Sequence, residues 1–200
     1  MTETLPGEDA QYMMAPLKRQ KLNANELENE DYRKSAVIIL LCTDVNGHYY
    51  IPLTERFAYD GVHSGQVSLP GGKCEEDDED PAITALRECA EEIGVEKNDV
   101  EILGQLTPLY IPVSKYLVNP IVGLCTIPNP DLRKNPREVK HIAKLLVNEL
   151  MNENIVRTGN IKLRDKQQIE APYFAVQDLK VWGATAMILS EFKTLLKTIS

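Results

Sequence analysis

One helix can be placed in this chain with both ends marked, within the segment GGKCEEDDEDPAITALRECAEEIGV from Gly71 to Val95. Apolar residues recur at helical spacing from position 81 to position 93. Pro81 suits a first helical turn, and Asp80 before it is a good N-cap. Gly94 is a typical stop signal after the last turn. The sequence therefore predicts a glycine-containing loop followed by a helix over 81–93.

An unbroken run of acidic residues, Glu75 to Asp80, precedes this helix. Like charges in such a run repel one another, so the run normally lies in solvent unless something holds it. We expect Glu75 to Asp78 to form a solvated part of the loop.

Three further carboxylates lie within the helix. Glu88 and Glu92 are four residues apart and share one face, with Glu91 on its flank. On an exposed helix each like-charged pair costs roughly a few tenths of a kcal/mol. A divalent cation reverses this repulsion, because Mg²⁺ prefers oxygen ligands. Taken alone, three carboxylates at this spacing on a helix usually form a solvated acidic face and not a metal site.

An arginine and a pair of glycines surround the carboxylates. Arg87 lies beside them, and Glu79 precedes it by eight residues. A guanidinium–carboxylate pair between Arg87 and Glu79 would fasten the loop to the helix. Gly71 and Gly72 let the backbone approach closely, with carbonyls available to a metal.

Together these residues resemble the signature of the Nudix hydrolases, G-x5-E-x7-R-E-U-x-E-E-x-G-U, in which U is a bulky aliphatic residue. Glu79, seven residues and then the segment from Arg87 to Val95 reproduce its second part. Two departures are visible. Cys89 replaces an aliphatic residue, and six residues instead of five separate Gly72 from Glu79.

The longer loop is similar to that of one branch of the family, the coenzyme A pyrophosphatases. The segment PLTERFAYDGVHSGQVSLPGG, residues 52–72, resembles the upstream motif of this branch, L-L-T-x-R followed by G-x3-F-P-G-G. The matching positions are Thr54, Arg56, Gly65, Pro70, Gly71 and Gly72, with Leu69 in place of Phe. The segments LPGEDAQYMMAP and VWGATAMIL are also similar to the branch.

One segment departs from the branch. Its members often carry arginine or lysine after the L-T-x-R arginine, where a base can meet CoA phosphates, whereas residues 57–62 contain an acid and no base. Lys73 and Arg19 are the candidates to replace this charge.

The resemblance implies the Nudix fold, an α/β/α sandwich around a mixed β-sheet within the α/β (α+β) class, with the signature as loop–helix–loop. Residues 1–34 are expected to be an N-terminal extension that packs on the domain, and residues 35–200 the Nudix hydrolase domain. The sequence does not decide the oligomeric state, and a homodimer is one of the possibilities.

The resemblance also implies a metal-dependent reaction at a phosphoanhydride, with Mg²⁺ or Mn²⁺ as the cofactor. Glu88 and Glu92 are then metal ligands, Glu91 is a third ligand or the base that deprotonates water, and the Gly71 or Gly72 carbonyl completes the metal shell. The other residues implied are Arg56, Lys73 and Gly71 for the substrate, Arg87 and Glu79 as support, and Glu138 and His63 as further candidates with ordinary structural alternatives.

For the substrate, the branch resemblance implies CoA or an acyl-CoA, cleaved to 3′,5′-ADP and a 4′-phosphopantetheine. The alternatives are another nucleoside diphosphate derivative, such as ADP-ribose, NADH or a dinucleoside polyphosphate, and a nucleotide-binding sensor without turnover. The carboxylate cluster argues against the sensor, because a site without catalysis has no need of mutually repelling glutamates.

The rest of the chain is typical of a globular protein with a substantial core. The net charge of −8 argues against binding to nucleic acids or membranes. The N-terminus lacks the features of an export signal, and the four cysteines form no CxxC pair, so we expect a cytoplasmic protein with reduced thiols. The predicted elements are a strand over 35–44, an Asn46-Gly47 turn, a strand to about Thr54, a strand and short helix in 137–152, a hairpin in 160–177 and a helix over 181–199.

Overall fold

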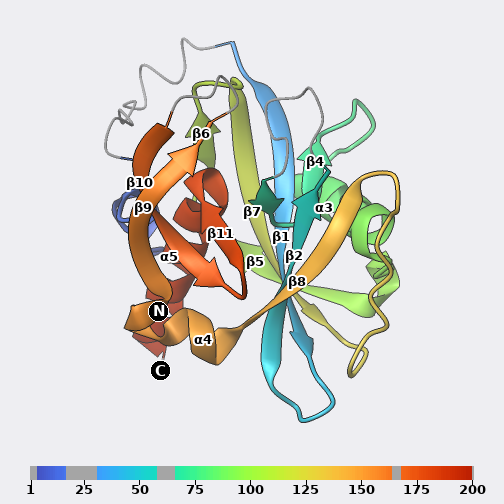
Figure 1. The fold of residues 1–200 in the computed structure, drawn as a ribbon. Coiled ribbons are helices and arrows are strands. Elements are labelled where there is room, and N and C mark those ends of the chain that lie inside the picture. The colour runs from blue at the N-terminus through green and yellow to red at the C-terminus, as the bar shows by residue number, and fades with distance from the viewer. Residues whose placement is uncertain (1–3, 17–30, 58–65, 164–167, 200) are drawn as a thin grey trace.

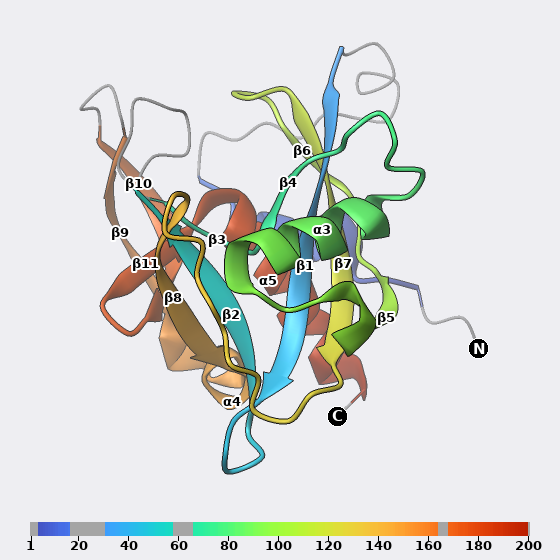
Figure 2. The ribbon, with the colours of Figure 1, turned by 90° about the vertical axis from the view of Figure 1, so that its right-hand side faces the viewer.

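A computed structural model describes residues 4–16, 31–57, 66–163 and 168–199 of the chain. It has a mixed eight-stranded sheet, a three-stranded antiparallel sheet, and helices on both faces of the larger sheet (Figures 1 and 2). The predicted α/β/α sandwich is thus confirmed. No helix among the described residues is long and apolar enough to cross a membrane.

The larger sheet has the order β3-β2-β1-β7-β5, with β4 paired to β1, β6 to β7 and β8 to β2. Its strands are β1 (Arg33–Thr43), β2 (Tyr49–Arg56), β3 (Val67–Ser68), β4 (Gly71–Lys73), β5 (Val100–Gln105), β6 (Leu109–Ile111), β7 (Tyr116–Cys125) and β8 (Val139–Leu146). The other elements are α1 (Gly7–Tyr12), α3 (Pro81–Ile93), α4 (Val147–Met151), β9 (Val156–Lys162), β10 (Gln168–Val176), β11 (Leu179–Trp182) and α5 (Gly183–Ile199).

Strand β1 organises the larger sheet. Along one edge it pairs in parallel with β7. Along the other edge it pairs with β4 near its start, where Ala36 lies opposite Gly72, and with β2 near its end, where Cys42 lies opposite Tyr50. The partner of β1 therefore changes from β4 to β2 along this edge, and the glycine pair lies at the β4 end.

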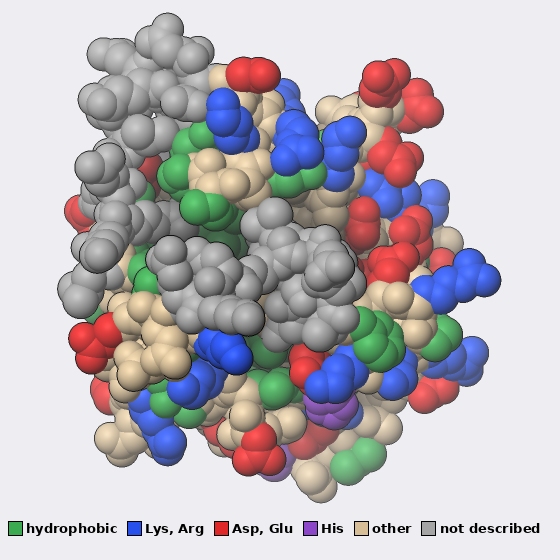
Figure 3. All heavy atoms as spheres, turned by 45° about the horizontal axis from the view of Figure 1, so that its top comes forward, with side chains coloured by type: hydrophobic (Ala, Val, Ile, Leu, Met, Phe, Trp, Pro, Cys, Tyr) green, Lys and Arg blue, Asp and Glu red, His purple; other side chains and the backbone are tan. Residues whose placement is uncertain are grey.

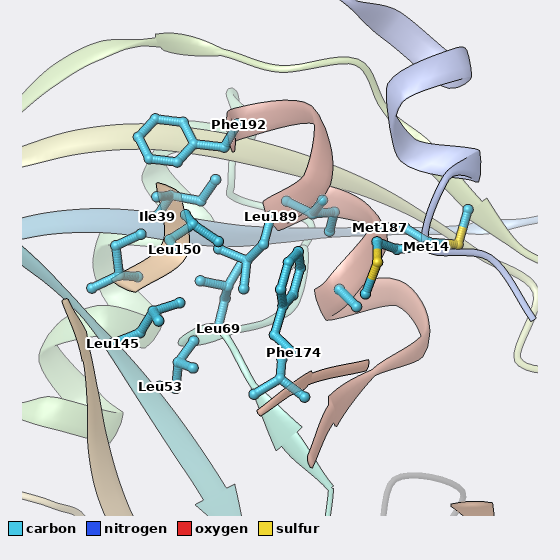
Figure 4. Close-up of a cluster of buried hydrophobic side chains, with 14 of the residues drawn as sticks. Met14, Ile39, Leu53, Leu69, Leu145, Leu150, Phe174, Met187, Leu189 and Phe192 are labelled. Carbon is cyan, nitrogen blue, oxygen red and sulfur yellow. The ribbon is translucent and has the colours of Figure 1, made fainter. Parts of the chain in front are cut away.

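The two faces of β1 belong to two hydrophobic cores. Ala36, Ile38 and Leu40 pack with residues of α3, whereas Ile39 belongs to the cluster on the α5 side. Figure 4 shows this second cluster, in which side chains of α5 such as Leu189 and Phe192 lie close to those of the sheet. The alternation follows from the two-residue period of a strand and places α3 and α5 on opposite faces.

The last helix begins two residues later than the sequence predicts. Val181 and Trp182 belong to β11 and pair with Phe174 and Tyr173 of β10. Gly183, with a φ of 64°, allows the change of direction into α5 because a residue without a Cβ adopts positive φ readily.

The N-terminal helix α1 packs against α5 through a buried carboxylate. Glu191 is fully buried. Its oxygens accept hydrogen bonds from the Gly7 amide at 3.2 Å, Gln11 Nε2 at 2.8 Å, and Thr107 at 3.2 Å from N and 2.7 Å from Oγ1. One side chain of α5 thus holds α1 and the loop between β5 and β6.

All four cysteines are unpaired thiols, in accord with the predicted reduced state. Cys42, Cys89 and Cys125 are buried together in the core beneath α3. Burial raises the pKa of the Cys89 thiol to about 12, so these residues behave as small apolar side chains.

We expect Glu191→Ala to lower the free energy of unfolding by about 2–4 kcal/mol, because it leaves several buried donors without an acceptor. Guanidinium-induced unfolding of the variant measures this loss. Glu8→Ala, which removes an exposed acid of α1, is the matched control and should shift stability by less than about 0.5 kcal/mol. Equal stability of Glu191→Ala and the parent protein would refute this role.

Candidate active site

Helix α3 has the predicted ends. Asp80 Oδ1 accepts a hydrogen bond from the Ala82 amide at 2.7 Å, which makes Asp80 the N-cap. Gly94 is left-handed, with a φ of 74°, and its amide donates to the Ala90 carbonyl at 3.1 Å. These fixed ends determine which way the helix presents its glutamates.

The three glutamates differ in exposure. The side chains of Glu92, Glu88 and Glu91 are 1%, 14% and 53% exposed. Glu88 and Glu92 therefore face the sheet, and Glu91 faces solvent. Side chains with so little exposure do not form a solvated face, so the solvated acidic face that the sequence also allowed is excluded for Glu88 and Glu92. Their charge has to be compensated by other groups, because removing a carboxylate from water is costly.

Glu92 is held by β2. Arg56 Nη2 donates to Glu92 Oε1 at 2.8 Å, and Thr54 Oγ1 donates to Oε2 at 3.4 Å. Burial raises the pKa of Glu92 to about 7, against the opposing effect of Arg56, and the charges of Glu88 and Glu138 raise it further. Glu138, a candidate from the sequence, thus lies close enough to Glu92 to act on its charge.

Glu88 lies against the glycine pair. Its Oε1 accepts a hydrogen bond from Arg87 Nη1 at 2.9 Å, and burial raises its pKa. A Cβ atom built on Gly72 would lie 2.2 Å from this same oxygen, so no larger residue fits there without displacing the carboxylate. The Gly71 carbonyl accepts from Arg56 Nη2 at 3.1 Å. The glycine pair therefore brings backbone oxygen and amide groups next to both buried glutamates.

The oxygen donors of this site have the chemistry that Mg²⁺ and Mn²⁺ prefer. Among the described residues, however, no three His, Cys, Asp or Glu side chains form a group ready to hold a metal ion. Glu88 and Glu92 instead pair with arginines, and Glu91 lies 3.7 Å from Arg87. The donors fit a hard cation in kind, and the predicted ligand set of Glu88, Glu91, Glu92 and Gly72 stays a prediction.

Among the loop acids, Asp78 and not Glu79 is hydrogen-bonded to Arg87, and the exposed Glu75 lies 3.9 Å from the same guanidinium. Asp78 Oδ2 accepts from Arg87 Nη2 at 3.1 Å, from Thr84 Oγ1 at 2.7 Å and from the Glu75 amide at 2.9 Å. These hydrogen bonds lower the pKa of Asp78, and its side chain is only 7% exposed. Glu79 is exposed, and its side chain forms no hydrogen bond or ion pair with the described residues.

This arrangement corrects two predictions. The pair between Arg87 and Glu79 is replaced by one with Asp78, and Asp78 is not part of the solvated loop. Glu75, Glu76 and Asp77 are exposed as predicted. The sequence contains a signal for the correction, because five residues separate Gly72 from Asp78, the number in the first half of the signature.

Of the other residues predicted to bind substrate, two lie at a cavity and two fall outside the described residues. Arg56 and Lys73 both line a cavity of about 750 Å³ that opens beside Gly71 and Gly72. Sequence reasoning did not find this cavity, because its walls come from distant parts of the chain. His63 and Arg19 lie outside the described residues.

Residues 32–186 of the chain match the NUDIX domain family. A Photorhabdus laumondii protein named uncharacterized Nudix hydrolase NudL is 37% identical over 70% of this chain and 73% of its own length. The human mitochondrial coenzyme A diphosphatase NUDT8 is 33% identical over 77% of this chain and 65% of its own length. The chain spans only 56% and 53% of two Arabidopsis thaliana relatives.

The solved structures give the same fold. The crystal structure of the Nudix hydrolase RenU from M. smegmatis superposes with a TM-score of 0.58 over 94% of this chain and 95% of its own, at 14% sequence identity.

We expect Asp78→Asn to lower the free energy of unfolding by about 1–3 kcal/mol, because a nearly buried acceptor of three hydrogen bonds loses its charge. Glu79→Gln, the same change one residue later, should alter stability by less than about 0.5 kcal/mol. Urea unfolding of both variants at neutral pH makes the comparison. A larger loss in Glu79→Gln would restore the pairing predicted from the sequence.

The metal-free protein should lose stability as the pH rises from about 5 to 8. Folding raises the pKa of Glu92 from an ordinary value of 4.5 to about 7, so the folded state binds this proton more tightly than the unfolded chain. Ionising Glu92 therefore costs up to about 3 kcal/mol across this window. Denaturant unfolding in a chelator should show a weaker pH dependence in Glu92→Gln. An identical pH dependence in both proteins would contradict the assignment.

Proposed function

Because the chain belongs to the Nudix hydrolase family, we propose that it hydrolyses the diphosphate of CoA or an acyl-CoA, with Mg²⁺ or Mn²⁺ as cofactor. The products are 3′,5′-ADP and a 4′-phosphopantetheine or its acyl derivative. The name of the human relative, a coenzyme A diphosphatase, supports this substrate, as do the upstream residues Thr54 and Arg56 and the Gly71–Gly72 pair.

One observation carries the hydrolase proposal. Glu92 is buried and Glu88, one turn earlier and 14% exposed, lies beside it next to a glycine strand that leaves no room for a side chain. Two carboxylates with raised pKa values destabilise the fold relative to apolar side chains of similar size, so packing alone does not account for them. Such perturbed groups beside a cavity are typical of a catalytic site, and they disfavour a sensor without turnover.

In this proposal Glu88 and Glu92 hold the cation, with Glu91 as third ligand or base and the Gly72 carbonyl in support. When bound, the cation neutralises the diphosphate and lowers the pKa of a bound water. Glu91 is exposed on the same helix, where it can accept a proton from water. Glu138 adds negative charge near Glu92, which strengthens attraction for a cation.

In this proposal two positive side chains that line the cavity beside the glycine pair, Arg56 and Lys73, bind the substrate. Arg56 touches Glu92 and the Gly71 carbonyl and also lines the cavity, so it lies between the glutamates and the space for substrate. Lys73 is exposed at the same cavity and has no acidic partner among the described residues. Both can bind phosphate oxygens of a substrate that extends from the glutamates into the cavity.

The proposal is tested by incubating the protein with Mg²⁺ or Mn²⁺ and, separately, CoA, ADP-ribose, NADH and a dinucleoside polyphosphate, with products resolved by mass. We expect 3′,5′-ADP and 4′-phosphopantetheine from CoA. Glu92→Gln should lower kcat at least about a hundredfold, because it weakens the charge that holds the cation. Glu101→Gln, at an exposed acid of β5, is the matched control and should keep full activity.

The outcomes separate the alternatives. If the protein cleaves ADP-ribose, NADH or the dinucleoside polyphosphate but not CoA, its substrate is another nucleoside diphosphate derivative. If the protein binds one of these compounds but turns none over faster than Glu92→Gln does, it is a nucleotide-binding sensor and not a hydrolase.

A further inference from the structure

One guanidinium nitrogen covers two oxygens at the place predicted for the cation. Arg56 Nη2 donates to Glu92 Oε1 at 2.8 Å and to the Gly71 carbonyl at 3.1 Å. Glu92 is a predicted ligand, and the Gly71 carbonyl is one of the two glycine carbonyls predicted to complete the metal shell. Carboxylate and carbonyl oxygens are the ligands that a hard cation takes. Arg56 and the cation therefore need the same two atoms.

The second arginine of the site is held differently. Arg87 Nη1 donates to Glu88, but Arg87 Nη2 donates to the Asp78 carboxylate at 3.1 Å and to the Lys73 carbonyl at 3.2 Å. Neither of these two acceptors is a predicted metal ligand. Arg87 therefore keeps its place whether or not Glu88 binds a cation.

Arg56 has no such second set of partners. Within the described part of the chain, its side chain donates only to Glu92 and to the Gly71 carbonyl. Both acceptors are lost to Arg56 when these oxygens bind a cation, and a partly buried charge without a partner is costly. The Arg56 side chain is 26% exposed and lines the cavity of about 750 Å³. It therefore has room to turn away from Glu92.

The cavity offers a displaced guanidinium no carboxylate. Its described lining residues include no Asp or Glu, and Lys73 is their one other charged side chain. On the face shown in Figure 3, Lys and Arg side chains gather around exposed hydrophobic side chains in the upper part of the view. Positive charge of this kind attracts anions, so a phosphate oxygen of the substrate is the acceptor that remains for Arg56.

We propose that Arg56 exchanges Glu92 for a substrate phosphate when the cation binds, so that cation and substrate each strengthen the binding of the other; this inference rests on the proposed function. In the metal-free protein, a substrate phosphate competes with Glu92 for the guanidinium, and the cation competes with the guanidinium for Glu92. Binding of either one removes the competition that the other meets. The coupling is equal in both directions, as linkage requires.

The first test measures Mn²⁺ affinity without substrate, by titration calorimetry. We expect Arg56→Met to bind Mn²⁺ at least about fivefold more tightly than the parent protein, because the competitor for Glu92 is removed. Lys73→Met is the matched control. It removes the same charge at the same cavity, but the Lys73 side chain forms no hydrogen bond or ion pair with the described residues. Its Mn²⁺ affinity should therefore change by less than about twofold. Thermal unfolding verifies that both variants are folded.

The second test follows the guanidinium in the parent protein and needs no variant to be stable. A guanidinium held by fixed acceptors rotates slowly and gives separate Nη signals in the NMR spectrum of protein labelled with [¹⁵N]arginine. The Arg56 signals are assigned by their absence in Arg56→Lys. We expect Mg²⁺ to merge the Arg56 signals and to leave those of Arg87 separate.

The third test frees Arg56 without a cation. In a chelator, Glu92→Gln should bind imidodiphosphate at least about fivefold more tightly than the parent protein, because a neutral amide holds the guanidinium more weakly than a carboxylate does. Glu88→Gln removes the same charge one turn earlier without freeing Arg56, and should give a smaller gain. The gain of Glu92→Gln should disappear when Arg56→Met is added.

Three results overturn the exchange while the proposed hydrolase function stands. One is an Arg56→Met variant that binds Mn²⁺ no more tightly than Lys73→Met. Another is a set of Arg56 signals that stays separate in saturating Mg²⁺. The third is a gain in imidodiphosphate affinity that Glu88→Gln and Glu92→Gln share equally. If the parent protein neither binds Mn²⁺ nor cleaves CoA or the other nucleoside diphosphate derivatives, the proposed function fails, and the exchange fails with it.

Discussion

The ion pair between Arg56 and Glu92 is the contact on which this site depends. Glu92 is 1% exposed, and a buried charge without a partner destabilises a protein by several kcal/mol. Arg56 supplies that partner at 2.8 Å and also donates to the Gly71 carbonyl. One guanidinium therefore joins α3, β2 and β4, and any change in the charge of Glu92 acts on all three elements.

Arg87 holds the outer side of the same helix. It donates to Glu88, to Asp78 and to the Lys73 carbonyl, so it links the helix to the loop and to the end of β4. The buried Glu92 and the half-buried Glu88 are thus each paired with an arginine. A divalent cation would compete with these guanidinium groups for the same oxygens. Charge compensation by arginine explains how the carboxylates stay close together on one face in the metal-free protein.

The parts of the fold that sequence could predict depend on neighbours in the chain. The cap at Asp80, the stop at Gly94 and the shared face of Glu88 and Glu92 follow from spacing alone. The roles of Glu191 and the cavity could not be predicted, because their partners lie far apart in sequence, as in the hydrogen bonds from Gly7 and Thr107 to Glu191. Val181 and Trp182 fit a helical pattern, yet pairing with β10 takes precedence over that local preference.

Arg87 pairs with Asp78 and not with the predicted Glu79, which shows what residue spacing alone cannot decide. Counting back from Arg87 selects Glu79, whereas counting forward from Gly72 selects Asp78, and the extra residue makes both counts impossible to satisfy together. The structure places the extra residue after the acid. Thr84 Oγ1 and the Glu75 amide converge on the same oxygen of Asp78 that Arg87 binds, so the turn before the helix is closed around this carboxylate. The acid that fits is the one whose backbone lies inside that turn, and the residue between it and the N-cap is free to face solvent.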